Sequence, residues 1–288
     1  MDEKIFWTTS YEDIINSIED ICGCKKEKIE KYIEASQPFT NIDITKINVE
    51  RFFQCIGIEF NNKLELFNMI KFDSCVISHV TSRIEEPDKC DIYSLVDSLV
   101  LPTTLNAFLS SKGLVFKEEN SKIQTYYNNG IVDWDKFDED EVYGNIGRVK
   151  NRLLKKGRYI DNCINGFLFN DCFWKDSNVS QIIKCPEIIL DICRILNRVD
   201  IIDEWKKVSI PYALGFLADI KDITIDEYSN YKTMKSKIYL IYKFIIYYLI
   251  QKHYNQWDEC HDNVKLRLKD NYSVKKDKIV GFYKIEDE

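Results

Sequence analysis

The sequence predicts an α+β fold, in which a strand-bearing core follows a helical N-terminal region and precedes a helical C-terminal part. The chain has 288 residues, of which 45% are hydrophobic and 13% aromatic, enough to bury a substantial core. Apolar residues recur at helical spacing near both ends, whereas short apolar runs bounded by turn residues dominate the middle. We therefore expect a helical region at 1–62, a core at 63–198 and a mainly helical region at 199–288.

The N-terminal region carries start and stop signals for helices. Ser10 can cap a helix, and isoleucines follow it at helical spacing. Gly23 breaks the pattern, which resumes over 25–35, and residues 48–55 could form another helix. The first part of the chain is thus expected to be a small helical assembly.

The middle of the chain alternates between strand and helix patterns. Residues 72–81 are strand-like, and Pro102-Thr103-Thr104 is a cap before a helix at 105–111 that Gly113 closes. Further short strands are expected at 114–116, 123–127, 131–134 and 164–170.

The C-terminal part is expected to be mainly helical. Helices are predicted at 201–208, 212–220 and 228–257, and a terminal strand or docked segment could follow from residue 264. The longest apolar run, 238–250, is shorter than the roughly 20 residues that span a bilayer, so it predicts a buried helix and no membrane association.

The net charge and the cysteine content indicate the cellular environment of the protein and limit the classes of partner that it is expected to bind. A net charge of -7 opposes nonspecific attraction to nucleic acid or anionic lipid. The chain opens with acidic residues and no apolar leader, so its ten cysteines are expected to be reduced thiols in the cytoplasm. Cys22-Gly23-Cys24 lacks the spacing of a zinc site, and the remaining cysteines are scattered, so no metal site is expected.

The segment His79-Val80-Thr81 is the most informative motif. Alternate residues of a strand point to opposite faces, so His79 and Thr81 share one face while Ser78 and Val80 take the other. A histidine at this position in a strand can take part in catalysis or act as a hydrogen-bonded structural residue. The chain lacks the glycine-rich, nucleophile-elbow and zinc-protease motifs of many enzymes.

Two later segments of the sequence form a pattern together with His79. One is Gly166-Phe167-Leu168-Phe169-Asn170-Asp171, followed by Ser177, and the other is Pro186-Glu187. In order and character, these pieces resemble the ADP-ribosyltransferase superfamily, with a histidine on an early strand, an aromatic strand leading to a serine, and a late glutamate. The resemblance covers about residues 70–195.

The resemblance implies a split, mixed β-sheet core that grips NAD, the substrate, in a cleft. His79 would contact the ribose and orient the nicotinamide end, and Thr81 would support the same pocket. The remaining roles that the resemblance implies are nicotinamide stacking by Phe169 or Phe167, pocket support by Ser177, and catalysis by the carboxylate of Glu187.

A carboxylate suits this chemistry because breaking the bond between nicotinamide and ribose develops oxocarbenium-like positive charge. Structural alternatives stay open for each position. Glu187 could be a first-turn acid behind Pro186, Phe167 and Phe169 could be core residues, and Ser177 could be a cap.

The expected function is NAD-dependent ADP-ribosyl transfer, a glycosyltransferase reaction, in a bacterial toxin or antiviral defence effector. The acceptor would be a protein or nucleic acid, with an antitoxin or regulatory protein as a further partner. A basic run at 148–158 is either a solvated helix face or an acceptor-binding patch. The alternatives are a non-catalytic helical interaction or regulatory protein of a defence system, and an NAD glycohydrolase.

Overall fold

The computed structural model describes residues 3–120, 122–137, 146–155, 162–176 and 179–286. They mix helices with two sheets and divide into two compact units. Unit 1 comprises Met1–Ser78, Asn165–Asp176 and Gly215–Arg267, and unit 2 comprises His79–Ile164, Ser177–Leu214 and Leu268–Glu288. Each unit is assembled from separated stretches of chain, whereas the predicted division into 1–62, 63–198 and 199–288 used contiguous ranges and stays a prediction.

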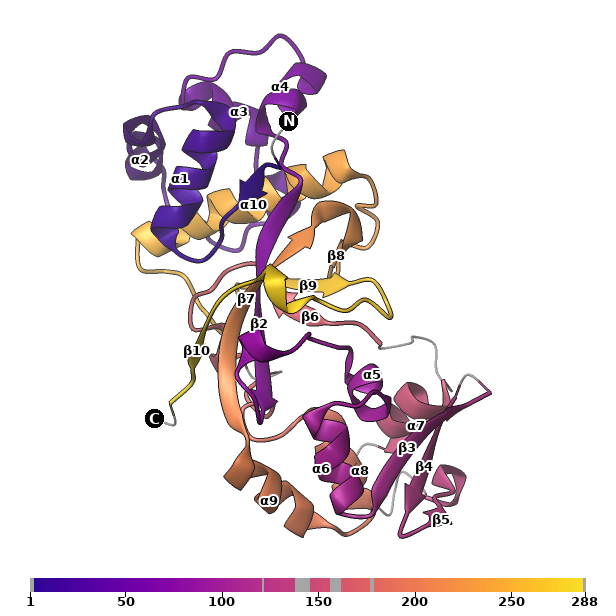
Figure 1. Cartoon of the computed structure of the whole chain (residues 1–288). Coiled ribbons are helices and arrows are strands. Elements are labelled where there is room, and N and C mark those ends of the chain that lie inside the picture. The colour runs from indigo at the N-terminus through magenta and orange to yellow at the C-terminus, as the bar shows by residue number, and fades with distance from the viewer. Residues whose placement is uncertain (1–2, 121, 138–145, 156–161, 177–178, 287–288) are drawn as a thin grey trace. The chain divides into compact units, whose positions relative to one another are not determined.

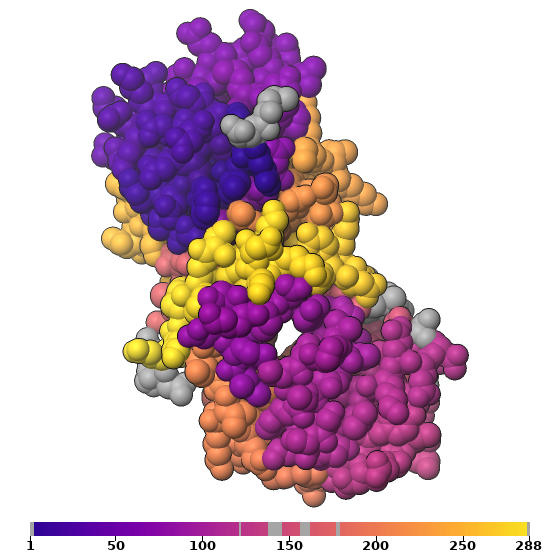
Figure 2. Space-filling model, in the orientation of Figure 1, coloured from indigo at the N-terminus to yellow at the C-terminus, as the bar shows by residue number. Residues whose placement is uncertain are grey.

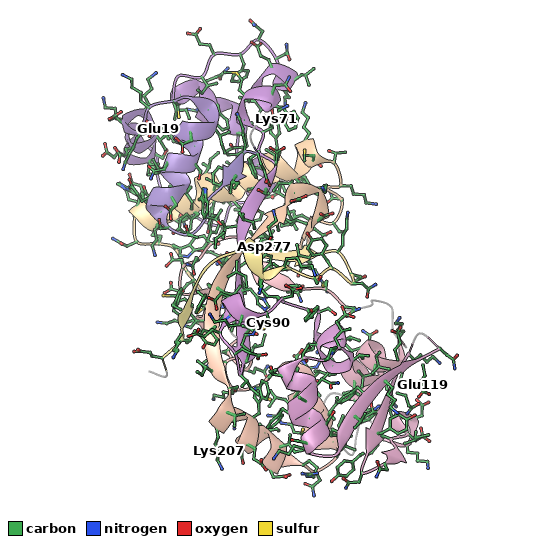
Figure 3. The ribbon with its side chains drawn as sticks, viewed as in Figure 1. Glu19, Lys71, Cys90, Glu119, Lys207 and Asp277 are labelled. Carbon is green, nitrogen blue, oxygen red and sulfur yellow. The ribbon has the colours of Figure 1, made fainter. Side chains whose placement is uncertain are left out.

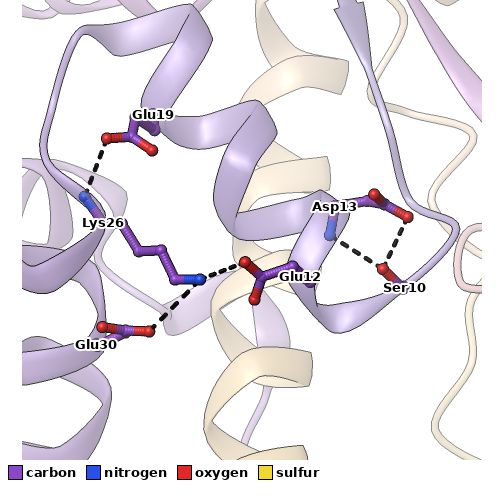
Figure 4. Close-up of polar contacts among 6 residues, drawn as sticks. All are labelled: Ser10, Glu12, Asp13, Glu19, Lys26 and Glu30. Carbon is purple, nitrogen blue, oxygen red and sulfur yellow. Dashed lines mark hydrogen bonds and ion pairs between the residues drawn. The ribbon is translucent and has the colours of Figure 1, made fainter.

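The predicted N-terminal helices are present in unit 1. Ser10 caps the first helix by accepting a hydrogen bond from the backbone N–H of Asp13, and Gly23 ends it at φ +69°, where glycine is unstrained. The backbone N–H and ammonium of Lys26, which opens the second helix, contact carboxylates of the first (Figure 4). The helices of unit 1 are α1 (Tyr11–Cys22), α2 (Lys26–Ala35), α3 (Val49–Cys55), α4 (Lys63–Ile70) and α10 (Met234–His253), with the short 3-10 helices η1 (Ile44–Lys46), η4 (Phe173–Lys175) and η5 (Ile220–Asp222).

Helix α10 forms the centre of unit 1, beside the N-terminal helices (Figure 1). The ring of Tyr242 is fully buried and meets the rings of Phe6, Phe53 and Phe72 edge-on. Its hydroxyl donates to the carbonyl of Ile70 at 2.9 Å. The prediction of a buried helix over 238–250 is therefore confirmed.

The larger sheet has the strand order β10-β7-β2-β6-β9-β8, and β1 pairs in parallel with β2. Gly166 is required where β6 meets β2, because a Cβ there would lie 2.6 Å from the carbonyl oxygen of Ser78. Two of the passages between the units fall inside strands, since the chain leaves unit 1 within β2, after Ser78, and re-enters it within β7, after Leu214. The strands are β1 (Ile5–Phe6), β2 (Ser74–Arg83), β6 (Asn165–Phe167), β7 (Ile210–Asp219), β8 (Ile223–Ile225), β9 (Lys265–Leu268) and β10 (Ile279–Lys284).

The prediction of a helix over 212–220 is wrong. These residues form most of β7, a ten-residue strand, and η5 begins at Ile220. Tyr212, Ala213 and Leu214 are buried in succession. A strand covered on both faces has a nearly continuous apolar sequence, which cannot be distinguished from a buried helix by its periodicity.

Unit 2 contains the smaller sheet and a second hydrophobic core. The strands predicted at 114–116 and 123–127 are present, and Asn128 and Asn129 lie at positive φ in the turn that follows the second of them. Trp134 is buried in this core and donates from Nε1 to the hydroxyl of Thr125 at 3.1 Å. The remaining elements of unit 2 are α5 (Leu95–Val100), α6 (Thr104–Ser111), β3 (Leu114–Glu119), β4 (Lys122–Tyr127), β5 (Gly130–Ile131), α7 (Ile146–Leu154), α8 (Glu187–Ile195) and α9 (Val199–Val208), with η2 (Pro87–Lys89), η3 (Trp134–Lys136) and η6 (Lys276–Lys278).

The C-terminal segment packs beside the chain that follows β2, and the predicted terminal strand is present as β10. Ile92 and Val274 form a β-bridge, and Asp91 accepts from the ammonium of Lys275 at 2.8 Å. Figure 2 shows the yellow atoms of this segment next to the purple atoms of the chain after β2. The fold of unit 2 therefore depends on contacts between residues that are far apart in the sequence.

All ten cysteines carry free thiols. Among the helices of the described residues, none combines the length and apolar character that a bilayer-spanning segment needs.

Candidate functional site

One face of β2 in unit 2 presents three polar side chains. His79, Thr81 and Arg83 are half-buried, whereas Val80 and Ser82 between them, and Ser78 before them, are buried. This is the alternation that a strand imposes. The sequence prediction that His79 and Thr81 share a face is therefore confirmed, and Arg83 extends that face by one further position.

The buried face of β2 is anchored by a hydroxyl network within unit 2. Ser82 donates to the hydroxyl of Ser209 at 2.9 Å, and Trp205 donates from Nε1 to Ser82 at the same distance. Trp205 is 1% exposed. These contacts fix the buried face of β2 against the core of unit 2. They therefore also set the direction in which the opposite face, with His79 and Thr81, points.

Arg83 lies against the loop that follows β2. Its Nη2 is 2.6 Å from the sulfur of Cys90, which Figure 3 labels, and 3.4 Å from the carbonyl oxygen of Asp91. Burial raises the pKa of the Cys90 thiol, and the nearby positive charge of Arg83 only partly opposes this effect. Cys90 is therefore mainly a protonated thiol at neutral pH.

Glu187 is the first residue of α8, directly after Pro186, as in the first-turn alternative. One oxygen of its carboxylate contacts Nη1 of Arg148, and the other lies 2.8 Å from Nη1 of Arg152, an ion pair without hydrogen-bond geometry. Arg148 also makes a bidentate pair with Asp191, with both N–O distances at 3.0 Å. The Asp191 side chain is only 2% exposed, so the cluster ties α7 to α8.

This pairing also gives the contacts of the described part of the basic run at 148–158. Arg148 and Arg152 face the acids of α8, and Lys150 donates to the carbonyl of Phe137 at 3.2 Å. Lys156 and Arg158 lie outside the described residues. In the described part of the run, the arginines therefore pack within unit 2 and do not form an open phosphate-binding patch.

The two candidate stacking residues belong to the core of unit 1. Phe169 is fully buried and stacks on Tyr248, with ring centroids 4.3 Å apart. Phe167 is 3% exposed and packs against Phe173. Neither ring has a face available to a ligand in this conformation, so nicotinamide stacking by either residue stays a prediction.

The structure thus places His79, Thr81 and Glu187 in unit 2, and Phe167 and Phe169 in unit 1. Ser177 lies outside the described residues. Sequence reasoning missed Arg83 and Asp191. The strand period could have indicated Arg83, two residues after Thr81, but no local pattern could have indicated the pairing of Asp191 with Arg148.

No protein-family model, curated protein or solved structure matches this chain. Within the part of the chain that the structure describes, no group of three or more histidine, cysteine, aspartate or glutamate residues could hold a metal ion.

Proposed function

We propose that this protein is an NAD-dependent ADP-ribosyltransferase that uses the half-buried face of β2 to bind NAD. The observation that carries the proposal is the placement of His79 and Thr81 on one face of a firmly anchored strand. An imidazole and a hydroxyl in this arrangement can hydrogen-bond the hydroxyl groups of a ribose. The proposal includes an ADP-ribosyltransferase-like split sheet and a macromolecular acceptor, either protein or nucleic acid.

In this proposal Glu187 is the catalytic carboxylate, since it belongs to the same unit as His79 and Thr81. A negative charge held near the ribose stabilises the oxocarbenium-like transition state more than the ground state. Glu187 contacts Arg148 and Arg152, so it must exchange at least one guanidinium partner when it acts on substrate. Nicotinamide stacking by Phe167 or Phe169 is not needed for this step.

The proposal is tested by incubating the full chain with NAD and measuring free nicotinamide and labelled acceptor. His79→Ala and Glu187→Gln should each abolish most of the release, with a loss on the order of 10²–10³-fold for the carboxylate. His253→Ala, in α10 of unit 1, is the matched control and should retain full activity. Release that persists in both site variants contradicts the proposal.

A second candidate is a non-catalytic interaction or regulatory protein. The burial of Phe167 and Phe169 and the ion pairs of Glu187 favour it, because all three residues already have structural partners. It predicts no nicotinamide release and no change in melting temperature with NAD. Release without a labelled macromolecule indicates instead an NAD glycohydrolase, with water as the acceptor.

A further inference from the structure

We propose that Arg83 is the centre of a binding site for a phosphate-bearing anion in unit 2. Within the part of the chain that the structure describes, the guanidinium Nη1 is buried and has no hydrogen-bond partner, while Nη2 contacts only the sulfur of Cys90 and the carbonyl oxygen of Asp91. Among the described residues, no carboxylate lies within ion-pair distance of Arg83. An arginine side chain stays protonated in proteins, so this positive charge cannot be removed by deprotonation.

Among the described residues, the acidic residues of the following loop make no ion pair with Arg83, and Asp91, Glu85 and Asp88 contact other groups. Asp91 accepts from the ammonium of Lys275 at 2.8 Å and from the backbone N–H of Lys276 at 3.0 Å. Glu85 accepts from the hydroxyl of Thr104. Glu86 and Asp88 also belong to this loop, and neither makes an ion pair with Arg83. A half-buried positive charge without an ion-pair partner favours an anion from outside the chain.

The surroundings of Arg83 indicate the chemical class of this anion. A guanidinium binds phosphate oxygens through two parallel hydrogen bonds, which makes phosphate a better partner than a spherical anion. Thr81 lies two positions earlier on the same face, about 7 Å away along the strand. Its hydroxyl makes no hydrogen bond within the described residues, so it can donate to a second group. A diphosphate or a phosphate ester with an adjacent hydroxyl fits this spacing.

This inference goes beyond the proposed function because it does not require NAD to be the ligand. The test uses inorganic pyrophosphate with the full chain, with sodium chloride added to keep the ionic strength constant. Titration calorimetry should show saturable binding, and the melting temperature should rise with pyrophosphate concentration. Arg83→Met should weaken binding at least tenfold, and Arg83→Lys should weaken it less, since the charge is kept and the bidentate geometry is lost.

Arg51→Met is the matched control, since Arg51 is an exposed arginine of α3 in unit 1, and it should bind pyrophosphate like the unmodified protein. Without any anion, Arg83→Met should melt at the same temperature as the unmodified protein or above it, because the substitution removes a half-buried charge that has no ion-pair partner. Equal binding by the unmodified protein and Arg83→Met overturns the proposal, as does a lack of binding by the unmodified protein.

The two proposals can fail separately. Pyrophosphate binding that depends on Arg83, without nicotinamide release, supports the anion site and contradicts the transferase. Nicotinamide release that survives Arg83→Met, without pyrophosphate binding, supports the transferase and contradicts the anion site.

Discussion

At the scale of single residues, the contact between β2 and β6 depends on the absence of one side chain. A Cβ on Gly166 would lie 2.4 Å from Cγ2 of Ile77 and 2.6 Å from the carbonyl oxygen of Ser78. Gly166→Ala should therefore lower the free energy of unfolding by about 1–3 kcal/mol, as overpacking does in other cores. Urea denaturation measures this change, and an unchanged midpoint would show that the strands separate without cost.

Ser78 provides the contrasting substitution at the same contact. Its side chain is buried, and its hydroxyl has no hydrogen-bond partner among the residues that the structure describes. Ser78→Ala removes this unsatisfied group without adding volume, so it should raise the free energy of unfolding by about 1 kcal/mol. The same denaturation experiment measures the change, and a clear loss of stability would mean that the hydroxyl is satisfied by water.

Cysteine reactivity should follow burial. Burial raises the pKa of the Cys75 thiol to about 12, whereas Cys55 is exposed at the end of α3. A raised pKa leaves little thiolate near pH 8, so iodoacetamide should label Cys55 quickly and Cys75 only after unfolding. Peptide mass spectrometry distinguishes the two sites, and rapid labelling of Cys75 in the folded protein would contradict its burial.

The same thiol affects stability at high pH. Above pH 9.0, the unfolded chain loses the Cys75 proton while the folded protein keeps it. The stabilisation from this group is therefore complete below pH 9 and is lost as the pH rises towards 12. Cys75→Ala should show a smaller loss of stability over this range than the unmodified protein.

At the scale of elements, the pairing of α7 with α8 depends on a charge cluster. Arg148→Met leaves the carboxylate of Asp191 buried and unpaired, which should cost about 3–5 kcal/mol. The double variant R148M/D191L should recover much of this loss, because no charge remains buried. Arg194→Met, an exposed position on α8, serves as the control and should change little. A mild effect of Arg148→Met, similar to the control, would show that solvent screens the cluster.

The elements also show how far the sequence can predict this fold. Helix α1 was predictable because Ser10 and Gly23 mark its ends with local chemistry. Helix α4 was missed although Asn62 caps it with two backbone hydrogen bonds, since its apolar pattern is short. Strand β7 was predicted as a helix because its burial comes from segments remote in sequence.

The candidate site, like the fold, was predictable only where a local sequence pattern determines the structure. The shared face of His79 and Thr81 follows from the strand period alone. Core packing was one of the two readings that the sequence left open for Phe169, but its partners Tyr248 and Trp257 could not be predicted, because they are far along the chain. The partners of Glu187 were equally hidden, since ion pairs between helices depend on tertiary packing.

At the scale of the whole molecule, the interleaved units predict the behaviour of fragments. The predicted core at 63–198 lacks β7, β8, β9 and β10 of the larger sheet, and it also lacks α10. Expressed alone, this fragment should lack the near-ultraviolet circular dichroism and dispersed NMR spectrum of a folded protein. A well-dispersed spectrum from the fragment would show that the sheet forms without its C-terminal strands.

The five transfers of the chain between the units, after residues 78, 164, 176, 214 and 267, also bear on its synthesis. Unit 1 is incomplete until residue 267 has been made, and the last stretch of unit 2 begins only at residue 268. The ribosome must therefore synthesise the chain through residue 267 before either unit can be completed. Nascent chains of this protein must keep apolar surface exposed for most of translation, which makes chaperone capture during that interval an expected part of its biogenesis.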